Sequence, residues 1–327
     1  MACSIQGSVL SNNTPRSTRH FVAPLEETPL VAIDAVKVDE KPSNLWIDAW
    51  RDARRRPIFW ISGALILLII AVALLPSVFS PINPLTEACA LSSSNGDPSG
   101  GHILGYTKQG CDVYARIIYG TSTSVSVGFI VILLTTVLGV AFGAFAGFFG
   151  GWVDATLSRL GDIFFSIPYI LAAVVIMSVL SQYRSIWTIS LAIGLFAWPS
   201  TARVLRAEIL RVKQADYITA SEALGVSRMK ILFQHVLPNS IAPVIAITTI
   251  SLAGAIVAEA TLSFLGVGLG GSIMSWGNDI NQAQRDIRVH PQTLIWPSLA
   301  LSITVFSFIL MGEVVRDALD PKARALR

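Results

Sequence analysis

Few residues in this chain have the types and spacing that catalysis requires. Gly266, Gly268 and Gly271 satisfy the GxGxxG spacing with which some proteins bind nucleotide phosphates. That motif works where a strand turns into a helix, whereas these glycines follow a long apolar run, so they indicate a glycine-rich helix exit. The chain contains no Gly-Lys dipeptide, and therefore no GxxxxGKS or GxxxxGKT loop for ATP. We also find no nucleophile–base pair and predict that the protein is not an enzyme.

The three cysteines give no indication of a metal centre. Cys3, Cys89 and Cys111 form no CxxC pair, and the four histidines do not cluster, so we expect no metal and no cofactor on this chain. Cys89 and Cys111 share a segment that we expect on the outer side of the membrane, where oxidising conditions favour a disulfide. A Cys89–Cys111 disulfide is the favoured prediction, and two unpaired thiols are the alternative.

Glu259 is the one carboxylate that lies well inside a long apolar run. Ionisable groups at such positions usually face the interior of a helix bundle or a cavity. Two roles stay open: Glu259 lines a translocation path or gate, or it packs the bundle through hydrogen bonds to neighbouring helices. Prolines inside three further apolar runs predict kinked helices around a central cavity, at Pro168, Pro199 and Pro297.

The elements that position these residues are long and apolar. Of the 327 residues 53% are hydrophobic and only 14% are charged, against roughly 25% charged residues in soluble domains. Runs of about 20 apolar residues cross a bilayer as helices, and these runs lack the alternation of membrane-barrel strands. We predict an all-α membrane protein with six transmembrane helices, at residues 58–80, 124–149, 160–181, 186–204, 240–266 and 293–314.

The positions of lysine and arginine predict the orientation in the membrane. Most of the 24 basic residues fall on one side if both termini are cytoplasmic, and the net charge of +3 then reflects topology and gives no indication of nucleic acid. Residues 1–44 are expected to be a disordered cytoplasmic tail, and the Trp- and Arg-rich residues 45–57 an amphipathic interfacial helix. The remaining segments are expected to be two outer loops, a cytoplasmic loop and a cytoplasmic tail, at residues 81–123, 267–292, 205–239 and 315–327.

A polar, helix-forming segment, ADYITASEALGVSRMKILFQHVLP, occupies residues 215–238 between two apolar runs. Its pattern predicts a helical hairpin that turns at Gly225, where a residue without a side chain allows positive φ. The apolar residues of the second helix are expected to face the membrane boundary: Ile231, Leu232, Val236 and Leu237. Such a hairpin is larger than a simple connection requires, and it predicts a surface that docks a soluble partner.

This segment resembles the EAA loop of ABC importer permeases, in which E-A-A-x-x-x-G is followed nine residues later by I-x-L-P. The sequence has Ala220, Gly225 and the Leu237–Pro238 pair at matching positions. It departs from the pattern at Thr219, Ser221 and His235. The resemblance implies that an ATPase binds this loop, and it assigns the coupling role to Asp216, Tyr217, Thr219, Ala220, Ser221, Leu224, Gly225, Leu237 and Pro238.

Further segments resemble the same family in the same order, over roughly residues 43–325. They are GYTKQGCDVYARIIYGTSTSV (105–125), GFFGGWVD (147–154), LSFLGVG (262–268), SWG (275–277) and GEVVRDALDPK (312–322). Together they are similar to the C-type permease of dipeptide and oligopeptide importers. The resemblance implies the type I ABC importer permease fold, with the coupling loop between the fourth and fifth spans.

The resemblance also implies a location and partners. It places the chain in the bacterial cytoplasmic membrane, beside a homologous B-type permease and in contact with the lipid bilayer. Two cytoplasmic ABC ATPases would hold ATP and magnesium, and an extracytoplasmic binding protein would deliver a di- or oligopeptide. Nickel or another small solute is the alternative cargo. A secondary transporter driven by an ion gradient is an alternative of another class, although it would need more intramembrane charges than Glu259.

Overall fold

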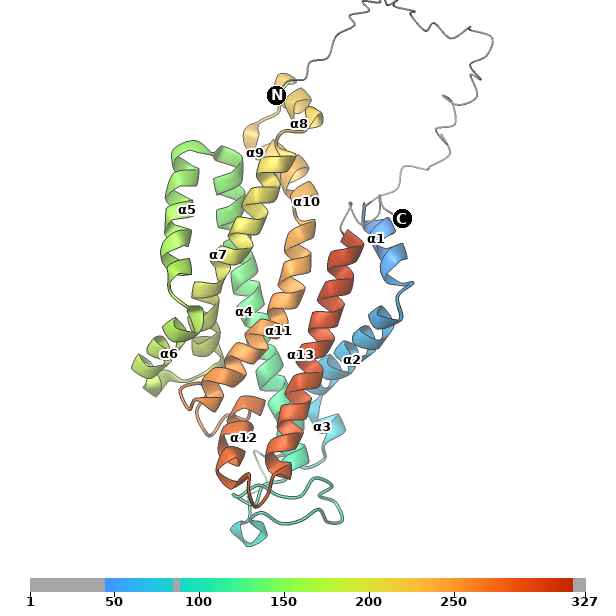
Figure 1. Ribbon diagram of the computed structural model, residues 1–327, viewed down its shortest axis with the longest axis vertical. Coiled ribbons are helices and arrows are strands. Elements are labelled where there is room, and N and C mark those ends of the chain that lie inside the picture. The colour runs from blue at the N-terminus through green and yellow to red at the C-terminus, as the bar shows by residue number, and fades with distance from the viewer. Residues whose placement is uncertain (1–44, 85–88, 320–327) are drawn as a thin grey trace, which may run out of the picture. The chain divides into compact units, whose positions relative to one another are not determined.

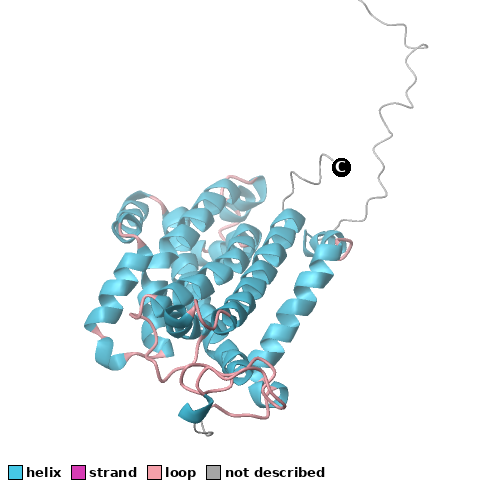
Figure 2. Ribbon diagram, turned by 60° about the horizontal axis from the view of Figure 1, so that its bottom comes forward, coloured by secondary structure: helices cyan, strands magenta, loops and turns pink. Residues whose placement is uncertain are grey.

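The computed structural model describes residues 45–84 and 89–319. In this part of the chain the regular elements are helical, apart from two isolated β-bridges within residues 99–112 (Figure 2). The longer helices are α2 (Pro57–Leu74), α4 (Val113–Phe149), α5 (Gly151–Ser166), α6 (Tyr169–Val179), α7 (Ile186–Val212), α11 (Ala242–Phe264) and α13 (Gln292–Leu319). The shorter helices are α1 (Leu45–Ala53), α3 (Pro76–Phe79), α8 (Asp216–Ala223), α9 (Arg228–Ile231), α10 (Leu237–Ser240) and α12 (Trp276–Ala283). The tail predicted at 1–44, and residues 320–327 of the tail predicted at 315–327, lie outside the described residues.

Five helices are long and apolar enough to cross a membrane, and a bent pair gives a sixth if it is counted as one span. The five are α2, α4, α7, α11 and α13. The bent pair replaces the span expected at 160–181: α5 and α6 meet at an angle of 75°. The bend lies at Ile167 and Pro168, because proline lacks an N–H and forces the residue before it into an extended conformation.

Several helices have other bounds than the sequence predicts. α4 begins at Val113, so residues 113–123 of the predicted outer loop are helical. The side chain of Asp112 explains this start, because it caps the helix by accepting the N–H of Ala115 at 2.6 Å. α7 runs on to Val212 and α13 to Leu319, beyond the predicted ends of their spans. The first span, predicted at 58–80, is instead α2 followed by α3, with a break at Leu75.

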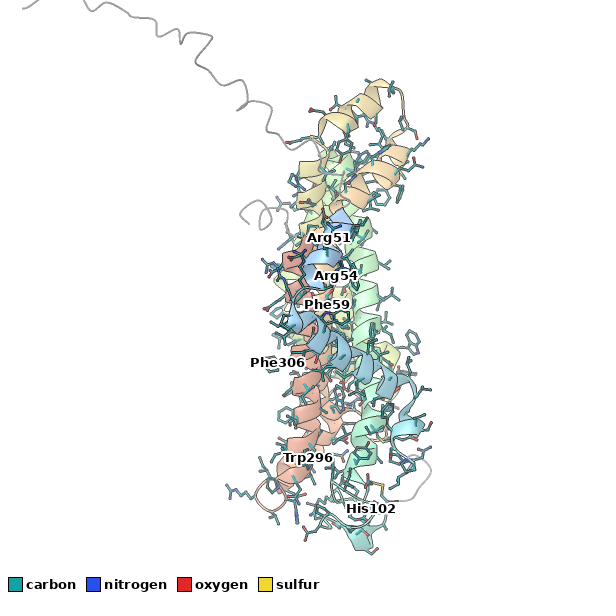
Figure 3. The ribbon with its side chains drawn as sticks, turned by 90° about the vertical axis from the view of Figure 1, so that its right-hand side faces the viewer. Arg51, Arg54, Phe59, His102, Trp296 and Phe306 are labelled. Atoms are coloured by element: carbon teal, nitrogen blue, oxygen red, sulfur yellow. A yellow bond between two sulfur atoms is a disulfide. The ribbon has the colours of Figure 1, made fainter. Side chains whose placement is uncertain are left out.

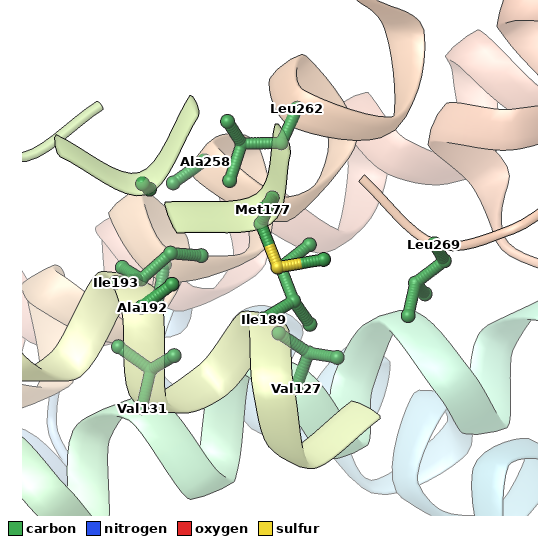
Figure 4. Close-up of a cluster of buried hydrophobic side chains, with 11 residues drawn as sticks. Val127, Val131, Met177, Ile189, Ala192, Ile193, Ala258, Leu262 and Leu269 are labelled. Atoms are coloured by element: carbon green, nitrogen blue, oxygen red, sulfur yellow. The ribbon is translucent and has the colours of Figure 1, made fainter. Parts of the chain in front are cut away.

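The bundle is built around α4, which packs along α7 and also contacts α11 and α2 (Figure 1). Met177 of α6 lies in one buried cluster with Val127 of α4, Ile189 of α7 and Leu262 of α11 (Figure 4). A second buried cluster joins Leu252 and Ile256 of α11 to Phe308 of α13. These clusters join the spans into one bundle, and many large apolar side chains stay exposed on its outside.

The amphipathic helix predicted at 45–57 is shorter, α1, and it packs on the end of α13. Ala49 and Ala53 are buried there, while Trp50 is exposed. Arg56 follows α1 and donates to the Asp317 carboxylate at 2.6 Å, which raises the pKa of the guanidinium above its usual value. Figure 3 shows Arg51 of α1 toward the end of the bundle where the α8–α10 region lies, and His102 at the opposite end.

Candidate functional site

The segment 215–238 folds into a hairpin whose turn is built by backbone geometry. α8 ends in a Schellman motif, in which the N–H of Val226 bonds to the carbonyl of Ser221 at 3.2 Å and that of Gly225 to Glu222 at 2.9 Å. Gly225 has φ of 79°, a left-handed conformation that a side chain disfavours. The chain then returns through α9, a π-helical turn at Leu232–Val236, and α10. We call residues 215–238 the hairpin.

One side of the hairpin is packed against the bundle. Ile218, Ile231, Leu232 and Val236 are each at most 1% exposed and lie in a cluster with residues of α4 and α7, among them Leu205. The expectation that the apolar residues of the second helix face the membrane boundary is therefore wrong. They fix the hairpin to α4 and α7, because burying such side chains stabilises by about 1.5–3 kcal/mol each.

The opposite side of the hairpin is open. Leu224 at its tip is 85% exposed and Tyr217 is 47% exposed. The other residues to which the sequence assigned the coupling role divide into two groups. Exposed ones are Asp216, Thr219, Ala220, Gly225 and Pro238, while Ser221 and Leu237 are partly buried. The structure thus gathers most of these residues on the open side of α8 and its turn.

Two apolar side chains on the returning half of the hairpin were missed by the sequence interpretation. Met229 is 46% exposed and Phe233 is 53% exposed. They stand four residues apart, so helical spacing alone could have placed them on one face. With Leu224 and Tyr217 they give the hairpin an apolar exposed surface, the kind of surface that marks an interaction site.

A cavity of about 400 Å³ lies in the bundle between α4, α7, α11 and the α5–α6 bend. Hydroxyl groups of Thr135, Ser200, Thr201 and Ser251 contribute to its wall. Phe165, Tyr169 and Phe196 supply aromatic surface. Among the described residues that line this cavity, none carries a charged side chain. The wall can therefore form hydrogen bonds with different molecules, and its described residues have no charged group that would favour a ligand of one charge over another.

Glu259 does not belong to this cavity wall. It is fully buried on α11, where Ser263 donates to one carboxylate oxygen at 2.8 Å and Ser124 of α4 donates to the other at 2.9 Å. This geometry speaks against Glu259 lining the translocation path and makes it a hydrogen-bonded link between α4 and α11. A side chain without exposed surface does not touch a molecule in the cavity in this conformation.

Two ion pairs hold α5 against α7 beside the cavity. Arg206 binds both oxygens of Asp154, each at 2.6 Å, and Arg203 donates to Asp162 at 2.8 Å. The Arg203 guanidinium also lies 3.8 Å from the centre of the Phe165 ring, a cation–π contact. Phe165 lines the cavity, so these contacts position part of its wall.

The end of the bundle opposite the hairpin carries the segment before α4. Cys89 and Cys111 are joined there by a disulfide, with their Cα atoms 4.4 Å apart. The Nδ1 atom of His102 lies 2.8 Å from the carboxylate of Asp112, which is next to Cys111, and it donates to that carboxylate in the tautomer that carries the proton on Nδ1. Lys108 reaches across to Asp286, which precedes α13, at 2.9 Å. These contacts tie the segment to the helices beneath it.

Comparison with protein families gives two separate matches, one in the first third of the chain and one over more than half of it. Residues 139–325 match the family described as binding-protein-dependent transport system inner membrane component. Residues 44–92 match the N-terminal TM domain of oligopeptide transport permease C. Proteins of this family are transport permeases without catalytic activity, and the ATPases are separate subunits.

Similar curated proteins cover most of this chain. The glutathione transport system permease protein GsiD of Pectobacterium atrosepticum is 32% identical over 287 residues, which are 88% of this chain and 94% of the relative. The oligopeptide transport system permease protein OppC of Bacillus subtilis is 32% identical over 291 residues, 89% of this chain and 94% of the relative. The dipeptide transport system permease protein DppC of Alkalihalophilus pseudofirmus is 30% identical over 282 residues, 86% of this chain and 91% of the relative.

A solved structure supports the fold. An inward-facing conformation of the MetNI methionine ABC transporter contains a chain that superposes with a TM-score of 0.52, at 21% identity, covering 63% of this chain and 96% of that chain. The all-helical membrane fold is therefore that of an ABC importer permease. By its sequence matches and its fold, this chain belongs to the family of binding-protein-dependent, multi-pass inner membrane permeases, as a C-type subunit of the kind represented by OppC, DppC and GsiD.

Proposed function

We propose that this chain forms half of the translocation path of an ATP-driven importer for di- or oligopeptides. The observation that carries the proposal is the hairpin, which is fixed to α4 and α7 on one side and presents Tyr217 and Leu224 on the other. An apolar surface on a rigid turn suits contact with a soluble protein. The docked proteins would be two cytoplasmic ABC ATPases, which hold ATP and magnesium.

The packing of the hairpin supplies a mechanical connection to the cavity. Ile218 and Ile231 lie in one cluster with Leu205 and Ile209 of α7. The same helix carries Ser200 and Thr201, which line the cavity one turn or more further along. Because packed interiors transmit displacement, a movement of the ATPases would shift the cavity wall. Closure of the ATPases on ATP would thereby change which side of the membrane the cavity faces.

The composition of the cavity wall supports a peptide cargo. A wall of hydroxyl, aromatic and aliphatic groups can accommodate peptides whose side chains differ in charge and size. The named relatives transport oligopeptides, dipeptides or glutathione, which are all peptide-like molecules. Nickel would be the better candidate if imidazole, thiolate or carboxylate ligands lined the cavity, and the described lining residues include none of these groups.

The two ends and the side of the bundle offer surfaces for the proposed partners. The hairpin end would be cytoplasmic, with both termini, so an extracytoplasmic peptide-binding protein would dock at the end with the disulfide. The exposed apolar side chains along α6 and α7, such as Leu171, Val175 and Leu191, are available to a homologous B-type permease or to lipid. An ion-driven carrier is less well supported, because the buried Glu259 carboxylate on α11 does not line the cavity between α4, α7 and α11.

Reconstitution in lipid with the partner permease, the ATPases and the binding protein tests this function. We expect ATP hydrolysis to rise with loaded binding protein when dipeptides or oligopeptides are supplied, and to lose that stimulation when this chain is omitted. Glutathione and Ni²⁺ in the same panel distinguish the cargoes. Hydrolysis that ignores every peptide, or that persists unchanged without this chain, would contradict the proposal.

A further inference from the structure

The Glu259 carboxylate is the centre of a buried hydrogen-bond network between helices. Ser263 donates to its Oε1 at 2.8 Å and Ser124 donates to its Oε2 at 2.9 Å. Glu259, Ser124 and Ser263 are all completely buried. The oxygen of each serine accepts in turn a backbone N–H, that of Leu269 at Ser263 and that of Trp276 at Ser124, both at 3.3 Å.

The carboxylate fixes the direction of the two hydroxyl groups. Both serine hydroxyl groups donate to the carboxylate, one to each oxygen, so each serine proton points toward Glu259. The lone pairs of each serine oxygen are then turned away from Glu259 and face the backbone N–H groups. Glu259 therefore orients the two serine oxygens that accept the backbone N–H groups of Leu269 and Trp276.

The two N–H groups belong to a segment that lies directly on α11. We call residues 266–283, which include α12, the outer cap. A Cβ at Gly268 would lie 2.4 Å from the backbone nitrogen of Ser263, and one at Gly277 would lie 2.6 Å from the Cα of Ala260. Only glycine permits such approach, so the glycines explain the LSFLGVG and SWG motifs as contacts between the outer cap and α11.

The outer cap also bonds to α4, at the end of the bundle opposite the hairpin (Figure 1). The indole Nε1 of Trp276 donates to the carbonyl of Ile117 at 3.2 Å. Arg116 pairs with Asp279, with its Nε 2.9 Å from the carboxylate. The outer cap therefore bridges α4 and α11, two of the helices that form the cavity wall.

We propose that Glu259 is a positioning residue, which holds the outer cap in one conformation across α4 and α11 through Ser124 and Ser263. The held cap keeps the outer end of the bundle closed until the binding protein engages. The first part rests on contacts within the chain alone, whereas the second part rests on the proposed function. A carboxylate is suited to this task because it accepts from two donors on different helices at once.

Hydrogen exchange of the assembled importer in lipid nanodiscs tests the positioning role. Ser263→Ala should accelerate exchange at Leu269 and leave Trp276 protected, and Ser124→Ala should do the reverse. Glu259→Gln keeps the shape but offers one acceptor oxygen in place of two, so at least one of these amides should exchange about tenfold faster. Glu313→Gln, the same change at an exposed site on α13, is the control and should leave both amides unchanged.

Two exchange results would overturn the positioning role. One is unchanged protection of the outer cap in Glu259→Gln and in both alanine variants. The other is faster exchange spread evenly over α4, α11 and α13, which would mean that Glu259 only contributes to general packing. Comparison of the serine variants keeps the test decisive even if Glu259→Gln folds poorly.

Steady-state ATP hydrolysis tests the closing role. A loosened outer cap should raise hydrolysis without binding protein severalfold, while the maximal rate with saturating loaded binding protein stays near that of the unmodified importer. A packing defect would lower both rates, and that result would overturn the closing role. If the unmodified importer shows no stimulation at all, the proposed function fails, and the exchange experiment still decides the positioning role.

Discussion

At the scale of single residues, the helix crossing that forms the centre of the bundle depends on glycines of α4. A Cβ at Gly139 would lie 2.6 Å from the Cβ of Thr201, and one at Gly143 would lie 2.6 Å from the carbonyl oxygen of Ala202. Both neighbours belong to α7. The carbonyl oxygen of Ala202 is a backbone atom, so it cannot move away by a change of side-chain rotamer. Small residues let membrane helices approach closely, and here they bring α7 against α4 beside the cavity.

Gly143→Ala should therefore destabilise the protein by about 1–3 kcal/mol, although alanine is the better helix former. Gly161→Ala is the matched control, because its Cβ would lie 3.7 Å from the Trp198 ring, an ordinary contact. Thermal unfolding of the purified variants in detergent measures the difference. Equal melting temperatures for the two variants would show that the α4–α7 approach is looser than described.

Sequence reasoning at this scale identifies unusual residues but not their partners. Glu259 stands out because a carboxylate is rare in an apolar run, yet its partner Ser124 is 135 positions away along the chain. Nothing in the spacing could connect the two, since the contact exists only after α4 and α11 pack. The exposure of Met229 and Phe233 could not be predicted for a different reason. They alternate with the buried residues Ile231, Leu232 and Val236, and apolar residue type alone does not distinguish the exposed from the buried side chains.

At the scale of elements, the disulfide closes a segment that has little regular structure. Cys89 and Cys111 are 22 positions apart, and between them lies one short 3₁₀ helix, Leu91–Ser93. A cross-link over such a length stabilises by about 3 kcal/mol on the chain-entropy estimate, because it restricts the unfolded segment. The bond fixes the segment on the side of the bundle where α4 begins.

Reduction, or the Cys89→Ser and Cys111→Ser double variant, should leave the bundle folded and make residues 89–111 sensitive to protease. Limited proteolysis with mass spectrometry would locate the cuts. Cys3→Ser, outside the described residues, serves as the control for loss of a thiol. Equal resistance of the oxidised and reduced proteins would contradict the stabilising role of the bond.

The elements themselves were predictable where one apolar run makes one helix. The span expected at 240–266 lies close to α11, and the span expected at 293–314 lies within the longer α13, since each is a long run with polar flanks. The third span was harder to predict, because Pro168 indicates a break but not a bend of 75°. The start of α4 at Val113 was not predicted either, because the capping residue Asp112 lies far outside the apolar part of the helix.

At the scale of the whole molecule, the hairpin and the outer cap are expected on opposite sides of the membrane. A pair of single-cysteine variants tests this orientation, on a chain in which the three natural cysteines are replaced by serine. Ser227 lies exposed in the hairpin and Ser272 lies exposed in the outer cap. A maleimide that cannot cross the membrane should label Ser272→Cys in intact cells, and Ser227→Cys only after the cells are opened. The reverse pattern would contradict the predicted topology.

The central claim is that the hairpin couples ATP hydrolysis to transport, and Gly225→Asp tests it most directly. Aspartate tolerates a left-handed φ better than most residues, and no atom lies within 4 Å of the added Cβ, so the hairpin should keep its fold. The new charged group would stand on the surface that contacts the ATPase. Gly151→Asp is the control, because Gly151 is exposed on the same side of the bundle, also has positive φ and lies outside the hairpin.

The measurement is peptide transported per ATP hydrolysed in the reconstituted importer, with the amount of folded chain in the membrane determined for each variant. We predict that Gly225→Asp lowers this ratio by about tenfold or more, while Gly151→Asp keeps it near the unmodified value. An unchanged ratio in Gly225→Asp would contradict the claim that this hairpin transmits the work of the ATPases.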